Sequence, residues 1–388
     1  MATDRMLKPV LALAAIFSVL TPSLAVAEEN GRWLEFEFPR DSPVLPVDLS
    51  LQGPGPMTAS MRGASLVIDL HTSLLLRNTG SKPLAGLTLL VEAQDLTPSG
   101  KGSVTLPSLR AQPGEVFPVR IDMQLTRPFN TGRARTGAMV QVSLDCALFS
   151  DLSAYGPDQL HLRRTLVVYE LEARRDRRYL ASLLESGKLA ELREELNFGL
   201  QDLNPAQIGL ELLQAPEGVL RTEQPIPVGP VAFPSSPVKS LGGDAQVAGN
   251  EVRASRVQVR NMSGRPVKGF DVGWIVRDER GRDFIAGSVA SAIPLAPVET
   301  ANMIQPGTLR FSHPGGQPMM VGALLAFVNT VEFSDGKLWI PSRVDIRQAT
   351  SDPILRRALA SSPEQQRLAD VYRRKGMGGL EEELKRVN

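Results

Sequence analysis

The chain has 388 residues, of which 43 are Lys or Arg and 42 are Asp or Glu, and 42% of them are hydrophobic. This length is sufficient for about two ordinary domains, each with a core of its own. The balance of charge provides no basic excess of the kind that nucleic-acid binding requires, so we predict no nucleic-acid partner. The single cysteine excludes an internal disulfide. Stability must therefore come from buried apolar area.

The first 27 residues are typical of a secretory signal. Arg5 and Lys8 precede an apolar run over 10–20, and small residues at 25–27 resemble a cleavage site. We therefore expect an extracytoplasmic protein, periplasmic or secreted, whose mature part is neutral: 43 basic residues minus two and 42 acidic residues minus one leave 41 of each. The alternative is anchoring by an uncleaved N-terminal helix, because 9–27 approaches the roughly 20 residues that a span needs. Membrane contact is expected only in that case.

Two stretches of the sequence repeat each other. RNTGSKPLAGL at 77–87 returns as RNMSGRPVKGF at 260–270, an offset of 183, and FSD at 149–151 returns at 333–335, an offset of 184. Two matches with nearly the same offset indicate a duplicated unit. The second stretch also contains the glycosylation sequon that begins at Asn261.

Apolar residues alternate with polar ones in each copy. Over 65–76 the polar face carries Asp69, His71 and Ser73, and 87–93 and 270–276 alternate in a similar way. A period of two predicts half-buried strands, and short strands between Gly, Pro and Asn turns predict an all-β sandwich in each copy. The opposite, apolar face of 65–76 carries Leu66, Ile68, Leu70, Leu74 and Leu76.

Turn residues extend the comparison between the copies. Asp335-Gly336 predicts a tight hairpin turn, and Leu152 in place of Gly336 predicts that the first copy turns differently. The Asn-x-Gly turn at 78–80, the strand after it and Pro-Gly-Glu at 113–115 resemble bacterial immunoglobulin-like modules of the CARDB type. The resemblance implies duplicated immunoglobulin-like β-sandwiches, although the second copy departs from it with Pro-Val-Glu at 297–299. It concerns turns and strands, so it bears on fold rather than on function.

Helical periodicity follows each copy, with breaks expected at Gly187 and Gly376. We interpret RRDRR at 174–178 as a solvated helix face and TLVVYELEA at 165–173 as a last strand. In the region between the copies, the Pro-rich part at 216–237 predicts an edge strand or extended linker, and the Gly-rich end a mobile loop. The sequence thus predicts a mainly β protein with α: a signal peptide (1–27), a first β-sandwich (28–165), a helical segment (166–205), a second β-sandwich with a Pro-rich entry (206–349) and a C-terminal helical segment (350–388).

Few residues suggest a chemistry. Asp151 and Asp335 are candidate metal ligands, together with Asp145 or Asn329 six residues earlier on the same strand face, although hairpin turns also explain an Asp in FSD. Tyr155 and Trp339 are candidate binding residues or core residues. Cys146 shares an apolar strand face with Val142, Leu144 and Leu148, which favours a core residue over a reactive thiol. The three histidines, His71, His161 and His313, show no metal-ligand spacing.

The sequence contains no familiar nucleophile or phosphate-loop motif, so we predict no catalytic residue and no cofactor. Our first hypothesis is an exported, non-catalytic binding or scaffold protein that acts through protein–protein contacts, with a peptide adding to an open sheet edge. The second is an exported hydrolase or carbohydrate-active protein with a site at the inter-domain loops. A third is adhesion stabilised by Ca²⁺ at Asp151 and Asp335.

Overall fold

The computed structural model describes residues 34–47, 57–93, 100–128, 139–200, 206–213 and 223–385. In these ranges the protein is mainly β with five helices. The predicted signal peptide at 1–27 lies outside the described residues. No helix in the described part of the chain is both long enough and apolar enough to cross a membrane.

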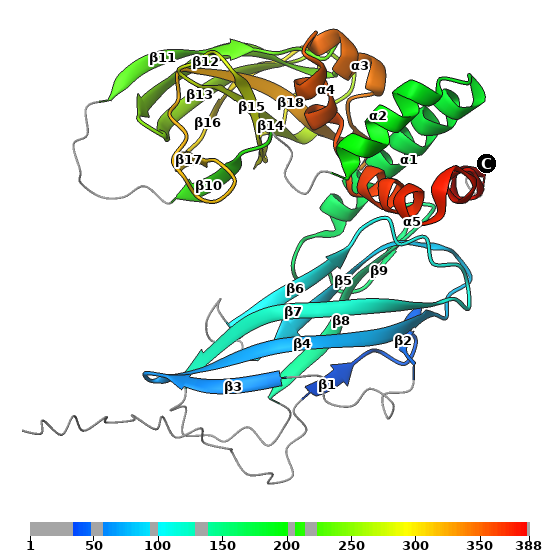
Figure 1. Cartoon of the computed structure of the whole chain (residues 1–388). Helices are drawn as coiled ribbons and strands as arrows, with labels where there is room; N and C mark the ends of the chain where they lie inside the picture. The colour runs from blue at the N-terminus through cyan, green and yellow to red at the C-terminus, as the bar shows by residue number, and fades with distance from the viewer. Residues whose placement is uncertain are drawn as a thin grey trace, which may run out of the picture.

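The first β unit contains the strands β1 to β9 in two sheets (Figure 1). One sheet has the order β1-β8-β5-β6, with β9 beside β8, and the other has the order β2-β4-β3, with β7 beside β4. The strands are β1 Leu34–Glu37, β2 Val44–Pro46, β3 Met57–Arg62, β4 Ser65–Asn78, β5 Leu84–Glu92, β6 Lys101–Leu106, β7 Val116–Pro128, β8 Val140–Phe149 and β9 Ala154–Tyr155.

The two sheets of the first β unit share one apolar core. Ile68 and Leu74 of β4 and Leu87 and Leu89 of β5 belong to the same cluster of buried side chains. The predicted apolar face of β4 is confirmed, because all five of its predicted residues are buried while His71 is exposed. The alternation therefore predicted this face correctly.

The outer face of β5 differs from the prediction. Thr88 and Leu90 are buried as well, so β5 is covered on both sides. Cys146 is buried, as predicted, but it packs with Leu148 and Leu166 outside the shared core. The pairing passes from Leu89–Leu144 to Thr88–Cys146, which makes Asp145 the extra residue of a β-bulge. Because a bulge shifts the side-chain alternation by one residue, Cys146 lies on the opposite face from Leu144.

The second β unit contains β10 to β19, hydrogen-bonded in the order β10-β17-β13-β12-β11-β18-β14-β15. In addition, β16 pairs with β13, and β19 pairs with β18. The strands are β10 Gly209–Leu213, β11 Gln224–Pro230, β12 Val238–Ala248, β13 Glu251–Asn261, β14 Val267–Arg277, β15 Asp283–Ser291, β16 Thr300–Ile304, β17 Thr308–Ser312, β18 Ala323–Phe333 and β19 Leu338–Trp339.

Of two predictions for the region between the copies, one is confirmed in part and the other is wrong. Within the Pro-rich part, 216–222 lies outside the described residues and 224–230 forms β11. Its residues 224–227 pair with β12 alone, as in an edge strand, whereas Val228 pairs with both β12 and β18, and the last two residues pair with β18 alone. Pro225 and Pro227 lack an N–H group, and both lie in the part of β11 that pairs with β12 only. The Gly-rich end forms β12 instead of a mobile loop. Gly242, with a φ of 96°, lies at a register shift of the strand, where a bulge requires a left-handed residue.

The two β units repeat the same strand pairings. β1 runs parallel to β8, as β11 does to β18, and β5 pairs with β6 and β8, as β14 does with β15 and β18. The register agrees as well. Leu84 of β5 pairs with Phe149 of β8, and the equivalent residue Val267 of β14 pairs with Phe333 of β18. The repeated stretches 77–87 and 260–270 therefore hold equivalent places in equivalent hairpins.

A buried asparagine fixes the same turn in each unit. Asn78 Nδ2 donates to the carbonyls of Lys82 and Ala111, both at 2.9 Å. Asn261 Nδ2 donates to the carbonyl of Arg265 at 2.8 Å and to that of Ala296 at 3.0 Å. Because the Asn261 amide is fully buried and already bonded, its sequon is not accessible to glycosylation.

Two predicted differences between the copies are absent. Leu152 adopts a φ of 68° and Gly336 a φ of 78°, so the turns after β8 and β18 have the same shape despite the change of residue. Likewise, Glu299 accepts a hydrogen bond from the backbone of Ala296 at 2.6 Å, as Glu115 does from Gln112 at 2.8 Å. The hydrogen bonds of the surrounding backbone thus maintain a left-handed residue even where glycine is missing.

Five helices form one body, which we call the helical body. The predicted last strand at 165–173 is wrong, because these residues belong to α1. The predicted breaks are confirmed: Gly187 follows α1 with a φ of 68°, and Gly376 interrupts α5 with a φ of 66°. The helices are α1 Arg163–Glu185, α2 Leu189–Gly199, α3 Arg343–Ala349, α4 Pro353–Ala360 and α5 Pro363–Lys385.

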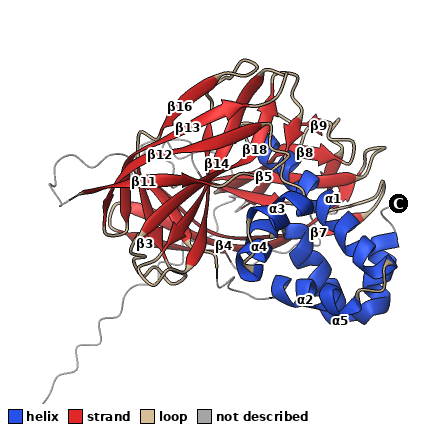
Figure 2. Cartoon of the chain, turned by 90° about the horizontal axis from the view of Figure 1, so that it is seen from above, coloured by secondary structure: helices blue, strands red, loops and turns tan. Residues whose placement is uncertain are grey.

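The helical body lies between the two β units, on one side of the molecule (Figures 1 and 2). Leucines of α1, α2 and α5 share one apolar cluster, which joins segments that are far apart in the sequence. The start of α1 contacts both β units. Leu166 packs beside Gly86 of β5, where an added Cβ would meet it at 3.0 Å. Arg164 forms ion pairs with Asp271 of β14 at 2.8 Å and with Glu332 of β18 at 3.1 Å.

Candidate functional site

The basic cluster 174–178 is not a solvated helix face, and that prediction is wrong. Asp176 is fully buried, and the side chains of Arg175 and Arg177 are only 8% and 6% exposed. Arg178 alone of the five is exposed. The charges of Arg175, Asp176 and Arg177 therefore belong to the interior of the helical body.

A regular stripe on α1 explains the burial of Arg177. Leu166, Glu170, Ala173, Arg177 and Leu180 follow one another at spacings of four and three residues, and all five are buried. Residues with this spacing share one helix face. Because 165–173 was predicted to be a strand, Leu166, Glu170 and Ala173 were not included in the helical periodicity. The spacing of seven residues between Glu170 and Arg177 is the sequence signal that places both on one helix face.

Asp176 is the centre of the buried network. Its carboxylate accepts hydrogen bonds from Arg175 Nε and Arg343 Nε, each at 2.9 Å, and from the hydroxyl of Ser362. Burial opposes ionisation of Asp176, but the charges of Arg175 and Arg343 hold its pKa below the ordinary value. The network links α1 to α3 and to the start of α5, and therefore connects the two predicted helical segments.

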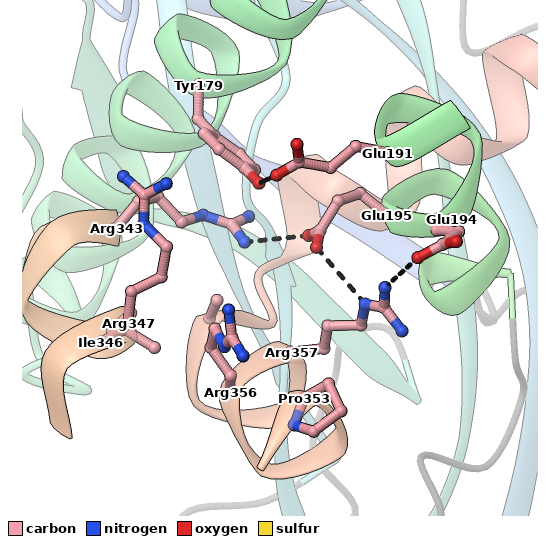
Figure 3. Close-up of a pocket in the computed structure, with 11 residues that line it drawn as sticks. Tyr179, Glu191, Glu194, Glu195, Arg343, Ile346, Arg347, Pro353, Arg356 and Arg357 are labelled. Atoms are coloured by element: carbon pink, nitrogen blue, oxygen red, sulfur yellow. Dashed lines mark hydrogen bonds and ion pairs between the residues drawn. The ribbon is translucent and has the colours of Figure 1, made fainter. Parts of the chain in front are cut away.

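A cavity of about 220 Å³ adjoins this network between α1, α2, α3 and α4 (Figure 3). Arg343 Nη1 lies 3.1 Å from Glu195 Oε2, and Arg357 Nη2 lies 2.6 Å from Glu194 Oε2. The Tyr179 hydroxyl donates to Glu191 at 2.9 Å. Each glutamate of the lining is thus bound by a cationic group or a hydroxyl. Its lining residues are Tyr179, Glu191, Glu194, Glu195, Arg343, Ile346, Arg347, Pro353, Arg356, Arg357 and Ala360.

The residues that line this cavity pair with one another and thereby join neighbouring helices. Burial raises the pKa of Tyr179, and the charge of Glu195 and the hydrogen bond to Glu191 act in the same direction, so the phenol stays protonated. Arg343 also lies over the Tyr179 ring, 4.7 Å from its centroid. The paired charges hold four helices together, and the lining contains no serine, cysteine or histidine.

The predicted metal candidates occupy the ends of equivalent hairpins. Asp151 Oδ2 lies 2.6 Å from Lys82 Nζ, and Asp335 Oδ2 lies 2.6 Å from Arg265 Nη2. The hydrogen bond from Lys82 holds the pKa of Asp151 below its usual range. Asp145 is buried and accepts from the Gln159 backbone at 2.7 Å, and its bulge ends the alternation that would have placed it on the same face as Asp151. No group of three or more His, Cys, Asp or Glu able to hold a metal occurs among the described residues.

The predicted binding residues also hold equivalent places, because Tyr155 pairs with Ala147 and Trp339 with Val331. The Tyr155 hydroxyl donates to Asp41 at 3.1 Å, whereas Trp339 packs against Phe233 with ring centroids 6.4 Å apart. Neither residue lines the cavity of Figure 3.

The histidines and Cys146 lie apart from that cavity. His71 pairs with Asp122 at 2.8 Å on an exposed strand face, and His313 packs edge-on against Phe284. Burial raises the pKa of the Cys146 thiol to about 11, which keeps it in its unreactive form at neutral pH. The structure thus does not bring the residues that the sequence singled out into one site.

Comparison with known proteins gives no assignment: no protein-family model matches the chain, and no curated protein matches it. Inferences about function therefore depend on the geometry.

Proposed function

We propose that this protein is an exported, non-catalytic binding or scaffold protein of the bacterial envelope or extracellular space, which acts through protein–protein contacts. We infer that its β units are duplicated immunoglobulin-like β-sandwiches. The shared strand pairings, the shared register and the two equivalent asparagines support the duplication.

The helical body supports the role of a scaffold. Arg164 joins α1 to β14 and β18, while Leu166 of the same helix packs on β5. A helix that contacts both β units and is fixed by a buried ion-pair network limits their relative motion. Binding surfaces on the two units would then be presented at a defined angle.

One difference between the units carries the proposal. In the second unit the chain itself covers the edge of β15: Ile208 donates to the Ile285 carbonyl at 2.9 Å, and Ile285 donates to that of Ala206 at 2.7 Å. The counterpart of β15 in the first unit is β6, which among the described residues pairs with β5 alone. An open strand edge is a template for an added strand. We propose that β6 accepts an extended segment of a partner protein.

A photo-cross-linking residue at Ser103 tests this proposal, because Ser103 is an exposed residue of β6. Illumination in the envelope fraction should give one reproducible protein adduct. The same group at Arg373, exposed on α5, is the matched control and should not give it. Identical adducts from both positions, or none from Ser103, would contradict the proposal.

A further inference from the structure

A second cavity, of about 480 Å³, lies between the first β unit and α1. Four arginines line it, Arg110 from the β unit and Arg174, Arg177 and Arg178 from α1, together with one glutamate, Glu170. Small-ligand sites usually have volumes of roughly 300–1,000 Å³. This cavity therefore has the size of a ligand site, and its lining is strongly basic.

The carboxylates around the cavity are shared between guanidinium groups. Glu170 Oε1 accepts from Arg174 Nε at 2.8 Å and also from Arg177 Nη2 at 3.0 Å. Arg177 Nη1 also pairs with Glu364 Oε1 at 3.2 Å, and Arg110 Nη1 lies 3.3 Å from the Glu383 carbonyl oxygen and 3.5 Å from Glu383 Oε2. Arg178 is exposed and forms no ion pair with any described residue. Positive charge therefore exceeds negative charge in the lining.

One lining residue carries a buried donor without a partner. The Arg177 side chain is 6% exposed, and its Nε has no acceptor among the described residues. A buried donor without an acceptor is destabilising. Burial lowers the pKa of the Arg110 guanidinium, and the like charges of Arg367 and Arg177 lower it further. An anion in the cavity would offset the repulsion between these like charges.

We propose that this cavity binds a phosphate-type oxyanion, either free inorganic phosphate or the phosphate of a small phosphomonoester. Guanidinium groups donate pairs of parallel hydrogen bonds to phosphate oxygens. A phosphate group presents three acceptor oxygens, which suits arginines that approach from two helix turns and from the facing loop. The volume leaves room for more than the phosphate group itself. This site is separate from β6 and does not depend on the role proposed for that strand.

Isothermal titration calorimetry on the full chain tests the site, with inorganic phosphate, glucose 6-phosphate and succinate as probes. Saturable binding of either phosphate probe, tighter than that of succinate, is the expected result. Stronger binding of glucose 6-phosphate would identify a phosphomonoester as the ligand, and equal binding would identify the free ion. No saturable binding, or binding of succinate at least as tight, would overturn the proposal.

The matched variants are Arg178→Gln and Arg193→Gln. Both arginines are exposed helical residues, but only Arg178 lines the cavity. Loss of a charge-assisted contact should raise the Kd for phosphate roughly tenfold or more in R178Q, whereas the Kd of R193Q should equal that of the wild type. If R178Q does not fold, phenylglyoxal modification of the wild-type chain replaces it. Phosphate should then protect Arg174 and Arg178 but not Arg193, and equal protection of all three would count against the site.

Discussion

Asp176 shows how much a single buried charge contributes to the helical body. It lies between Arg175 and Arg343, and all three side chains are at most 10% exposed. Burying a charge costs free energy, and the attraction within the buried pair offsets that cost. Removing one partner leaves the other charge buried without compensation, so the loss of stability far exceeds the net contribution of the pair. The same geometry at the surface would contribute little.

We predict that Asp176→Asn destabilises the protein by about 3–5 kcal/mol, because the buried Arg175 loses its ion-pair partner and Arg343 keeps only Glu195. The free energy of unfolding from urea titration measures the effect. Asp370→Asn is the matched control: its pair with Arg373 is exposed and should contribute less than about 1 kcal/mol. Similar losses in the two variants would show that the buried network does not stabilise the fold.

Glu172, also on α1, titrates in the neutral range. Burial raises its pKa from 4.5 to about 7, the charge of Arg175 opposes the rise and that of Asp176 adds to it. The folded protein therefore holds a proton that the unfolded chain releases at lower pH. This contribution to stability is complete below pH 4.5 and is lost as the pH rises through 7.

We predict that Glu172→Gln removes this part of the pH dependence. Between pH 5 and 8 the wild type should lose on the order of 2 kcal/mol more stability than the variant. Urea midpoints measured across this pH range for both proteins give the difference. Parallel curves would show that Glu172 has an ordinary pKa in the folded state.

At the scale of elements, hairpin turns keep their shape in the two β units even where the residue changes. Leu152 and Gly336 share a left-handed backbone. Backbone bonds fix it in each case, since the amide of Leu152 donates to Phe149 and that of Gly336 to Phe333, both at 2.9 Å. Strand register and backbone hydrogen bonds therefore determine the shape of these turns. A glycine only lowers the conformational free-energy cost of the left-handed residue.

We predict that Gly336→Ala lowers the free energy of unfolding by about 1 kcal/mol, because a side chain in the left-handed region is strained. The added Cβ meets no atom within 4 Å, so the loss would be conformational. Gly264→Ala, also free of contacts but not left-handed, should change stability by less than half as much. Equal changes in thermal unfolding would refute the explanation.

At the scale of the whole molecule, α1 is the element that relates the β units. It packs on the outer face of β5 through Leu166 and pairs with β14 and β18 through Arg164. Its middle and end belong to the network and the apolar cluster shared with α5. The relative placement of the units thus depends on contacts that connect distant parts of the sequence.

We predict that Arg164→Gln broadens the distribution of distances between the β units without unfolding either one. Energy transfer between dyes at Thr58→Cys and Glu279→Cys, both exposed positions, measures this distribution. The native Cys146 is buried and should not be labelled. Arg277→Gln, which removes an ion pair inside the second unit, should leave the distribution unchanged. An unchanged distribution in R164Q would show that its ion pairs do not fix the units.

The sequence by itself determined the apolar face of β4, the repeat of 77–87 in 260–270 and the helix breaks at Gly187 and Gly376. These features depend on side-chain periodicity and local backbone preference, which a sequence displays directly. Only the tertiary structure decided the position of Cys146, the burial of Asp176 and the meeting of Arg110 with the arginines of α1. A single bulge residue reverses a strand face, and charges become interior only when distant segments supply their partners.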